Sequence, residues 1–509
     1  MKTLFLSILL VLVAASFYTI YSSAERESDI PMITWRTDAN PQREDQVKLF
    51  EQWLIKNGHV TPDGRAKVRV RVETANNQST LIQAVSGMAG DIFDTGDLIG
   101  YQQLGVCTDV TEEAKARGFG LDTTYTGMAR LLTDDNGRQY GYPCNGATVS
   151  MWINLDTLKR FGFDERPPLE WTPEEFEKMG VEYVKRANEG KARQEYFFTQ
   201  SLDSGWGCAM IMSIVRSRGL DLYNETLTRC IGNHEYFRDA FALFHKWTYK
   251  DHIAPTAADV AAMNTDAGYG GGDYSNFLSG KYAMIVMGRY CLIRFREDEE
   301  KTGRDINFAV SQLPMYEFKN LPISSRSAVL YKGSKYKELG LLFLEFLASR
   351  EYNQYIIDMA DGLPPNLDVV RDSIPEIEKQ RPNERDTSAL EFQWAETIAI
   401  PGNWSPYVKT GTTNWLQNSL NRYFNDRATL EEAVAFLEDR YNFEIENSKE
   451  ANPKVMKQWE EDWAIQQKID EYKKLGKKIP VQWIKNPFYV KYYRAKGMLD
   501  EGAAPGGDK

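Results

Sequence analysis

The stretch Leu81–Thr111, LIQAVSGMAGDIFDTGDLIGYQQLGVCTDVT, decides the fold. Its apolar spacing predicts the end of a helix, and Gly87 and Gly90 then stop that helix. The short apolar run Asp91–Asp94 is typical of a buried strand that ends in polar residues, and a second amphipathic run follows it. This order of helix, turn, strand, polar tip and helix predicts an open α/β sheet, which binds ligands at the carboxyl ends of its strands.

The residues before this stretch continue the alternation of strand and helix. Pro31–Trp35 predicts an opening strand, and a helix follows with Asn40 as its N-cap and Pro41 as its first residue. Ala66–Thr74, in which valines alternate with basic residues, predicts a second strand. We therefore expect the N-terminal segment to fold as β-α-β-α-β-α around a parallel sheet.

Length and composition exclude several classes of protein. A chain of 509 residues predicts two to four domains, and a net charge of −11 argues against nucleic-acid binding, which needs a basic surface. Most of the 12 Trp, 27 Tyr and 24 Phe are expected in cores, but enough remain to stack on sugar rings. The five cysteines have no metal-binding or redox spacing; they are either buried thiols or include a disulfide, for which Cys208 and Cys230 are closest in sequence.

The first 24 residues differ from the rest of the chain. Lys2, the apolar run Leu4–Val13 and the small residues up to Ala24 predict a signal peptide that is cleaved after Ala24. The apolar run Leu4–Tyr21 is also close to the length that spans a membrane, so an uncleaved anchor is the alternative. Either way, we expect the body of the protein outside the cytoplasm, in the periplasm or extracellular.

Four further stretches carry motifs. Gly137–Asn154 has a Tyr-Gly-x-Pro turn before a strand that ends in an aromatic residue and Asn, and Thr172–Glu175 predicts a helix start with a capping box. Phe277–Tyr290, FLSGKYAMIVMGRY, follows the pattern F-x-x-G-x-x-A-M-x-x-x-G-x-aromatic, and Gly362–Asn366 gives a G-x-x-P loop. With Leu81–Thr111, these motifs resemble the maltose-binding-protein-like bacterial extracellular solute-binding proteins, the sugar-capturing subunits of ABC importers.

The resemblance covers about residues 31–450 and implies a fold. It implies a two-lobed α/β periplasmic binding protein of type II-like form, in which each lobe has a mainly parallel sheet flanked by helices and the chain crosses three times between lobes. The resulting assignment is residues 1–24 to the signal peptide, 31–143 plus 277–322 to the first lobe, 144–276 plus 323–455 to the second lobe, and 456–509 to a basic, aromatic C-terminal extension with a disordered end. The extension is either a wrapping tail or a dock for a membrane surface, a partner or an anionic glycan.

The resemblance also implies a function. We expect a monomeric receptor that closes on a carbohydrate between its lobes and delivers it to the permease of an ABC transporter, without a cofactor, a metal or a nucleic-acid partner. Polar and aromatic residues near strand tips and cleft loops are the candidate ligand contacts: Asp38, Asn40, Gln78, Asp94, Thr95, Asn145, Trp206, Tyr290, Ser325, Asn366 and Trp404. Helix capping would equally explain Asp38 and Asn40. We expect the lobes to close by bending near Tyr142–Ala147 and at the two other crossings.

A secreted glycoside hydrolase or lyase is the alternative function. Such enzymes need two carboxylates that flank the scissile bond, and only Asp94 and Asp97 form an acid pair at a predicted strand end. The chain has no G-x-S-x-G motif, and its four histidines form no H-E-x-x-H motif. We therefore expect binding without catalysis. Peptides and polyamines remain alternative ligands within the same fold.

Overall fold

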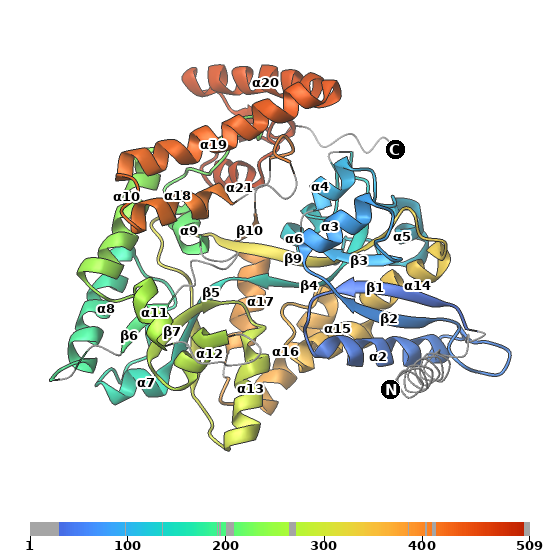
Figure 1. The fold of residues 1–509 in the computed structure, drawn as a ribbon, viewed down its shortest axis with the longest axis horizontal. Coiled ribbons are helices and arrows are strands. Elements are labelled where there is room, and N and C mark those ends of the chain that lie inside the picture. Colours follow the sequence, from blue (N-terminus) through green and yellow to red (C-terminus); the bar gives the residue numbers. More distant parts are fainter. Residues whose placement is uncertain are drawn as a thin grey trace, which may run out of the picture.

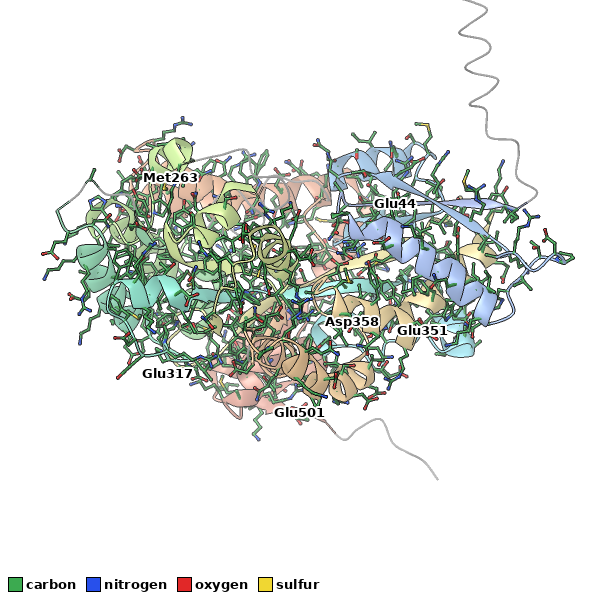
Figure 2. The ribbon with its side chains drawn as sticks, turned by 90° about the horizontal axis from the view of Figure 1, so that it is seen from below. Glu44, Met263, Glu317, Glu351, Asp358 and Glu501 are labelled. Carbon is green, nitrogen blue, oxygen red and sulfur yellow. The ribbon has the colours of Figure 1, made fainter. Side chains whose placement is uncertain are left out.

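Two β-sheets, each covered by helices, form the centres of two lobes (Figure 1). The computed structural model describes residues 30–502, apart from 97, 135, 191, 193–194, 200–207, 264–270, 385, 403–404 and 410–413. The predicted signal peptide (1–24), Asp97 and two predicted ligand residues, Trp206 and Trp404, lie outside the described residues. Figure 2 shows the lobes from below, with Glu44 and Glu351 on the first lobe and Met263 and Glu317 on the second.

The first sheet has the strand order β10-β9-β3-β1-β2, and β4 also pairs with β9. Its strands are β1 (Met32–Thr37), β2 (Arg69–Thr74), β3 (Ile92–Thr95), β4 (Gly141–Thr148), β9 (Leu321–Leu330) and β10 (Ala399–Pro401). Strand β1 is parallel to β2 and β3, as predicted, whereas β9 runs antiparallel to both β3 and β4. The carboxyl ends of β1 and β3 therefore meet at one edge, beside the strands that lead to the second lobe.

Helices cover both faces of the first sheet. They are α2 (Gln42–Lys56), α3 (Asn77–Val85), α4 (Leu98–Gln103), α5 (Thr111–Arg117), α6 (Thr126–Arg130), α14 (Lys337–Ala348) and α15 (Arg350–Asp358). The ring of Phe343 on α14 lies 5.0 Å from that of Trp35 and 5.2 Å from that of Phe50, measured between centroids. Aromatic packing between α2, α14 and β1 thus fixes the strand whose tip carries the predicted site residues.

The second sheet has the strand order β6-β7-β5-β8. Its strands are β5 (Ser150–Asn154), β6 (Tyr196–Thr199), β7 (Tyr282–Met287) and β8 (Phe308–Ser311). Strand β5 runs antiparallel to β7 and β8, and β6 runs parallel to β7, so this sheet is mixed. The chain passes between the two lobes from β4 to β5, from β8 to β9, and from β10 to the helix that follows it.

The helices of the second lobe come from both the middle and the C-terminal part of the chain. They are α7 (Leu155–Arg160), α8 (Pro173–Ala187), α9 (Ala209–Ser217), α10 (Glu235–His245) with a π-helix (Lys246–Lys250), α11 (Ala257–Met263), α12 (Gly271–Leu278), α13 (Cys291–Thr302), α18 (Trp415–Phe424) and α19 (Leu430–Ala451). Two further helices, α16 (Leu367–Gln380) and α17 (Thr387–Thr397), lie below the crossing strands (Figure 1). The predicted capping box at the start of α8 is present, with Thr172 and Glu175 bonded reciprocally.

Strand pairing corrects two sequence-based assignments. Residues 277–322 were expected in the first lobe, but β7 and β8 within this segment pair with β5 in the second sheet. The buried strand β5 needs a partner on each edge for its backbone groups, and these two strands supply both. Residues 323–330 were expected in the second lobe but belong to β9 of the first sheet, which already begins at Leu321. Serines at its alternate buried positions concealed the strand pattern. The helices α14 and α15 and the strand β10 were also expected in the second lobe, but they pack on or pair with the first sheet.

The C-terminal extension folds against the second lobe. It contains α20 (Pro453–Lys474), β11 (Ile479–Pro480), a 3-10 helix (Val481–Trp483), α21 (Pro487–Ala495) and β12 (Leu499–Asp500). The buried Glu225 accepts hydrogen bonds from Lys473 Nζ (2.7 Å), Gln466 Nε2 (2.8 Å) and the Tyr493 hydroxyl (2.5 Å). Burial alone would raise the pKa of Glu225, but the charge of Lys473 and these hydrogen bonds hold it below its ordinary value. One carboxylate thus anchors both helices of the extension.

All five cysteines are buried free thiols, so the disulfide considered between Cys208 and Cys230 does not form. Within the described part of the chain, no helix combines the length and apolarity needed to cross a bilayer.

Candidate functional site

A polar cluster occupies the carboxyl ends of β1 and β3, where the crossing strands β4 and β9 meet them. Arg326 on β9 lies at its centre and donates from Nη1 to Asp94 Oδ2 (2.5 Å) and Thr37 Oγ1 (3.0 Å). Its Nε donates to Asn145 Oδ1 (3.3 Å) on β4, and its guanidinium lies 5.8 Å from the Trp35 ring centroid. A single cation therefore joins four strands at the predicted strand tips.

The carboxylate of Asp94 is saturated by this cluster. Besides Arg326, it accepts from Trp35 Nε1 at Oδ1 (2.8 Å) and from the Thr37 hydroxyl at Oδ2 (2.5 Å). Asp94 as a whole is only 8% exposed. Asp94 was expected to bind a ligand hydroxyl, but its two oxygens already serve to fasten β3 to β1 and β9.

A second carboxylate, Asp361, extends the cluster toward α2. It accepts from Arg43 Nη1, from Gln46 Nε2 (2.9 Å) and from Asn40 Nδ2 (3.2 Å), and its backbone oxygen accepts from Asn145 Nδ2 (2.6 Å). The loop after α15 is thereby fixed to the start of α2 and to β4. Because Asp361 lies far from these residues in sequence, it was missed by sequence analysis.

Asp38 forms the exposed rim of the cluster. Its carboxylate accepts from Arg43 Nε (2.6 Å), while its side chain remains 48% exposed. Burial alone would raise the pKa of Asp38, but the charges of Arg326 and Arg43 hold it well below its ordinary value. Asp38 is therefore an ionised acceptor that still reaches solvent.

The other predicted ligand residues that the structure describes do not gather at one place: two lie beside the cluster, and the rest lie elsewhere. Ser325 and Thr95 lie beside the cluster on β9 and β3, and both are buried. Gln78 is exposed on α3, and the Tyr290 hydroxyl at the start of α13 donates to Met287 Sδ (3.2 Å). Asn366 caps α16 by accepting from the amide of Asp368 (3.0 Å), so a structural role accounts for it. Asn40 was expected to be the N-cap of the first helix, but Pro41 occupies that position and α2 begins at Gln42, one residue later than predicted; Asn40 Oδ1 still accepts from the amide of Gln42 (2.9 Å).

Two charged side chains are buried at the crossings between lobes. Glu391 on α17 accepts from the hydroxyls of Thr148 and Ser150, which flank the passage from β4 to β5. Burial raises the pKa of Glu391 to about 7. Arg289, just after β7, donates from Nη1 to the backbone oxygen of Gly362 (3.0 Å), and burial lowers its pKa to about 10. Neither residue was predicted, because each depends on tertiary contacts.

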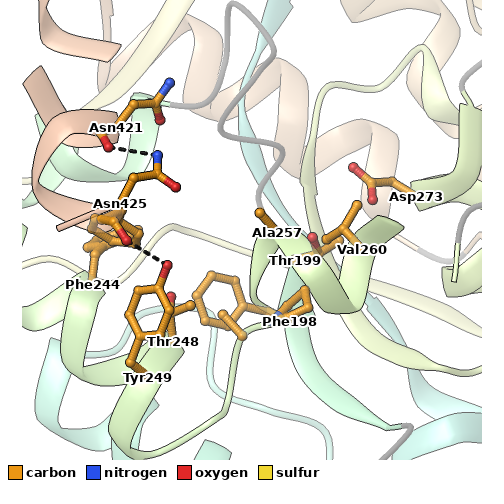
Figure 3. Close-up of a pocket in the computed structure, with 13 residues that line it drawn as sticks. Phe198, Thr199, Phe244, Thr248, Tyr249, Ala257, Val260, Asp273, Asn421 and Asn425 are labelled. Carbon is orange, nitrogen blue, oxygen red and sulfur yellow. Dashed lines mark hydrogen bonds between the residues drawn. The ribbon is translucent and has the colours of Figure 1, made fainter. Parts of the chain in front are cut away.

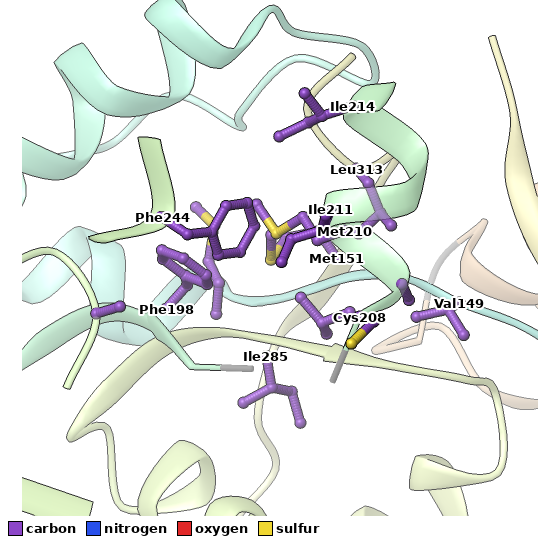
Figure 4. Packing of buried hydrophobic residues seen from close by; sticks show 14 of the residues in the cluster. Val149, Met151, Phe198, Cys208, Met210, Ile211, Ile214, Phe244, Ile285 and Leu313 are labelled. Atoms are coloured by element: carbon purple, nitrogen blue, oxygen red, sulfur yellow. The ribbon is translucent and has the colours of Figure 1, made fainter. Parts of the chain in front are cut away.

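A cavity of about 210 Å³ opens in the second lobe at the carboxyl end of β6 (Figure 3). Helices α10, α11, α12 and α18 and the π-helix enclose it. We call it the second-lobe pocket; its lining combines aromatic rings with hydroxyl, amide and carboxylate groups, including Phe198, Thr199, Tyr249, Asp273, Asn421 and Asn425. Phe198 and Phe244 continue from its wall into the core around Met210 (Figure 4), so this wall is rigid.

A groove of about 660 Å³, which we call the aliphatic groove, lies between α3 and α4 of the first lobe and the junction of α19 and α20. Its walls are mainly aliphatic, with Ile82, Val85 and Leu104 on one side and Val455 on the other. Ile82 and Val85 are 62% and 60% exposed. None of the described residues that line this groove is aromatic, so it suits apposition of two protein surfaces better than recognition of a sugar.

The profile of the bacterial extracellular solute-binding proteins matches residues 64–354, more than half of the chain. This chain belongs to that family. No curated protein matches the solute-binding protein, but many solved structures share its fold. An ABC substrate-binding protein from Listeria monocytogenes in complex with cycloalternan has a TM-score of 0.65 at 20% identity, over 81% of this chain and 98% of the other. These findings confirm the predicted family and the two-lobed α/β fold.

Two further structures show how widely this fold is used. Maltose-bound MalE3 of T. maritima has a TM-score of 0.65 at 17% identity, over 81% of this chain and 99% of the other. UgpB of Mycobacterium tuberculosis, in complex with glycerophosphocholine, has a TM-score of 0.63 at 14% identity, over 82% of this chain and 99% of the other. The ligand of this solute-binding protein must therefore be argued from its own residues.

Proposed function

We propose that this solute-binding protein captures a carbohydrate, either a mono- or an oligosaccharide, and delivers it to the permease of an ABC transporter. The observation that carries the proposal is the lining of the second-lobe pocket. Aromatic faces stack on the C–H groups of a sugar ring, while hydroxyl, amide and carboxylate groups bond to its hydroxyls. Tyr249, which is 37% exposed, is the ring of this pocket that a ligand could reach first.

The polar cluster supports a role in closure of the lobes. Arg326, Asp94 and Asp361 fasten the crossing strands to the first sheet, so the first lobe can move as one body. Rotation would then be confined to the passages beyond this cluster, which include the backbone near Thr148 and Ser150. Closure would also narrow the aliphatic groove between α3–α4 and the junction of α19 and α20.

We further propose that the protein binds without catalysis, as a monomer outside the cytoplasm. Among the residues described, no group of three or more His, Cys, Asp or Glu side chains is placed to bind a metal ion. The alternative, a glycoside hydrolase or lyase, needs a pair of carboxylates across an open site. Both oxygens of Asp94, the strand-end acid that favoured this alternative, are engaged internally.

A thermal-shift screen against neutral sugars, amino sugars, oligosaccharides, peptides and polyamines tests the proposal, because a ligand of the folded state raises the melting temperature. We expect carbohydrates to shift it and Tyr249→Ala to reduce that shift. Tyr336→Ala, which removes a similarly exposed ring from the first lobe, is the matched control. A screen in which only non-carbohydrates stabilise the protein would refute the proposal, and release of shortened oligosaccharides would favour the enzyme. Uptake assays in cells with and without the protein test delivery.

A further inference from the structure

We propose that the second-lobe pocket binds a protonated amino group through Asp273, and hence that the captured carbohydrate is an amino sugar. This inference rests on the proposed function, because it names the class of sugar. Asp273 lies in the first turn of α12, on the wall beside Thr199 and Val260 and across the pocket from Asn421 and Asn425 (Figure 3).

Asp273 has no hydrogen-bond or ion-pair partner within the described structure. Among the described residues, eight acidic residues are exposed by 9% or less, and each carboxylate accepts at least one hydrogen bond from a neighbouring group. Asp259 on the adjacent α11 accepts from both the amide and the hydroxyl of Thr256. By contrast, no hydrogen bond or ion pair from a described residue reaches the partly buried carboxylate of Asp273. A charged group withdrawn from water without a partner is costly, and a ligand cation would remove that cost.

The charge of the pocket lining also favours a cation. No lysine, arginine or histidine is among the described residues that line it. Burial raises the pKa of Asp273, and no nearby cation offsets that effect. The rings of Phe198, Phe244 and Tyr249 present negative faces, which favour a cation in the same space. Acid and rings together therefore complement an ammonium group.

The polar groups of the pocket indicate which kind of ammonium compound fits. A polyamine carries several positive charges, whereas Asp273 is the only acid among the described lining residues. The remaining polar groups are neutral. They include the hydroxyl groups of Thr199 and Thr248 and the amides of Asn421 and Asn425, which suit sugar hydroxyls. One amine surrounded by several hydroxyls matches this set, and the space of about 210 Å³ suits a single sugar unit.

Calorimetric titration of the full chain tests the inference. The probes are chitosan oligosaccharides with free amines, their N-acetylated counterparts of equal length, neutral maltooligosaccharides and spermidine. We expect the free-amine sugar to bind about tenfold or more tightly than the N-acetylated one at neutral pH. Asp273→Asn should abolish this preference and leave the affinity for the neutral sugar within about twofold. Asp63→Asn removes an equal charge at the surface of the first lobe, away from the pocket lining, and should change neither value.

The outcomes separate the two proposals. Equal affinity for the free-amine and N-acetylated sugars would overturn the amino-sugar inference and leave carbohydrate capture standing. Binding of spermidine with no carbohydrate bound would overturn both. If Asp273→Asn fails to fold, the comparison of the two sugars on the unmodified protein still decides the inference. We expect this variant to melt at or above the temperature of the parent, because it removes an unpaired carboxylate.

Discussion

Arg326 Nη1 lies 2.5 Å from Asp94 Oδ2, and this ion pair joins β9 to β3 at the point where the chain returns from the second lobe. The Arg326 side chain is 15% exposed and that of Asp94 is 6% exposed. Removal of one partner from such a pair leaves the other charge buried and unmatched. The pair is therefore a structural joint of the first lobe.

Asp94→Asn should lower the free energy of unfolding by about 3 kcal/mol, because Arg326 would lose its counter-charge in a largely buried setting. Urea denaturation followed by tryptophan fluorescence measures the change. Asp63→Asn, which disrupts an ion pair with Arg65 at the surface, serves as the control and should have a much smaller effect. Equal losses in the two variants would contradict the structural role of the pair.

Glu391 should contribute more to the stability of the protein in acid than at neutral pH. Its pKa rises from an ordinary 4.5 to about 7 in the folded state, so folding favours the protonated form. This contribution is fully present below pH 4.5 and is lost as the pH rises through about 7, by about 3 kcal/mol in all. Glu391→Gln should remove this dependence of the free energy of unfolding on pH, and the variant should be more stable than the parent protein at pH 8. Glu376→Gln, at an exposed position on α16, should leave this pH dependence unchanged.

Glu225→Gln should loosen the C-terminal extension, because Lys473 and Tyr493 lose a common anionic acceptor. Faster hydrogen exchange in α20 and α21, with exchange in the first sheet unchanged, is the expected result. The lowered pKa of Glu225 predicts the same loosening in the parent protein as the pH falls through that pKa. Glu317→Gln removes an exposed pair with Lys496 on the same extension and should leave exchange unaltered.

Gly141→Ala should be strongly destabilising, since a Cβ at this residue would lie 2.2 Å from the backbone oxygen of Ala328. The strands β4 and β9 would have to separate at the entrance to the first crossing. Gly96→Ala is the matched control, because its nearest neighbour, the oxygen of Ser325, lies at 3.5 Å. Thermal melting of both variants checks this prediction, and similar melting temperatures would disprove it.

Patterns between neighbouring residues in the sequence predicted many of the strands and helices. The candidate site was harder to predict, because its residues meet only through contacts between distant parts of the chain. The strand expected at Asp91–Asp94 is β3 (Ile92–Thr95), and the capping box of Thr172 and Glu175 forms, because both depend on neighbours in sequence. Arg326 and Asp94 are 232 residues apart, so no periodicity could reveal that they meet. The placement of β7 and β8 failed for a related reason, since backbone pairing leaves no mark in a buried apolar strand.

The burial of all five thiols has a consequence for handling and for measurement. The protein reaches its native state without any oxidation step, so a reducing environment should leave it intact. Burial also raises the pKa of Cys208 to about 12, which keeps that sulfur unreactive toward alkylating dyes at neutral pH. A cysteine introduced on the outside of each lobe would then take up fluorophores selectively, and energy transfer between them would follow the approach of the lobes in real time.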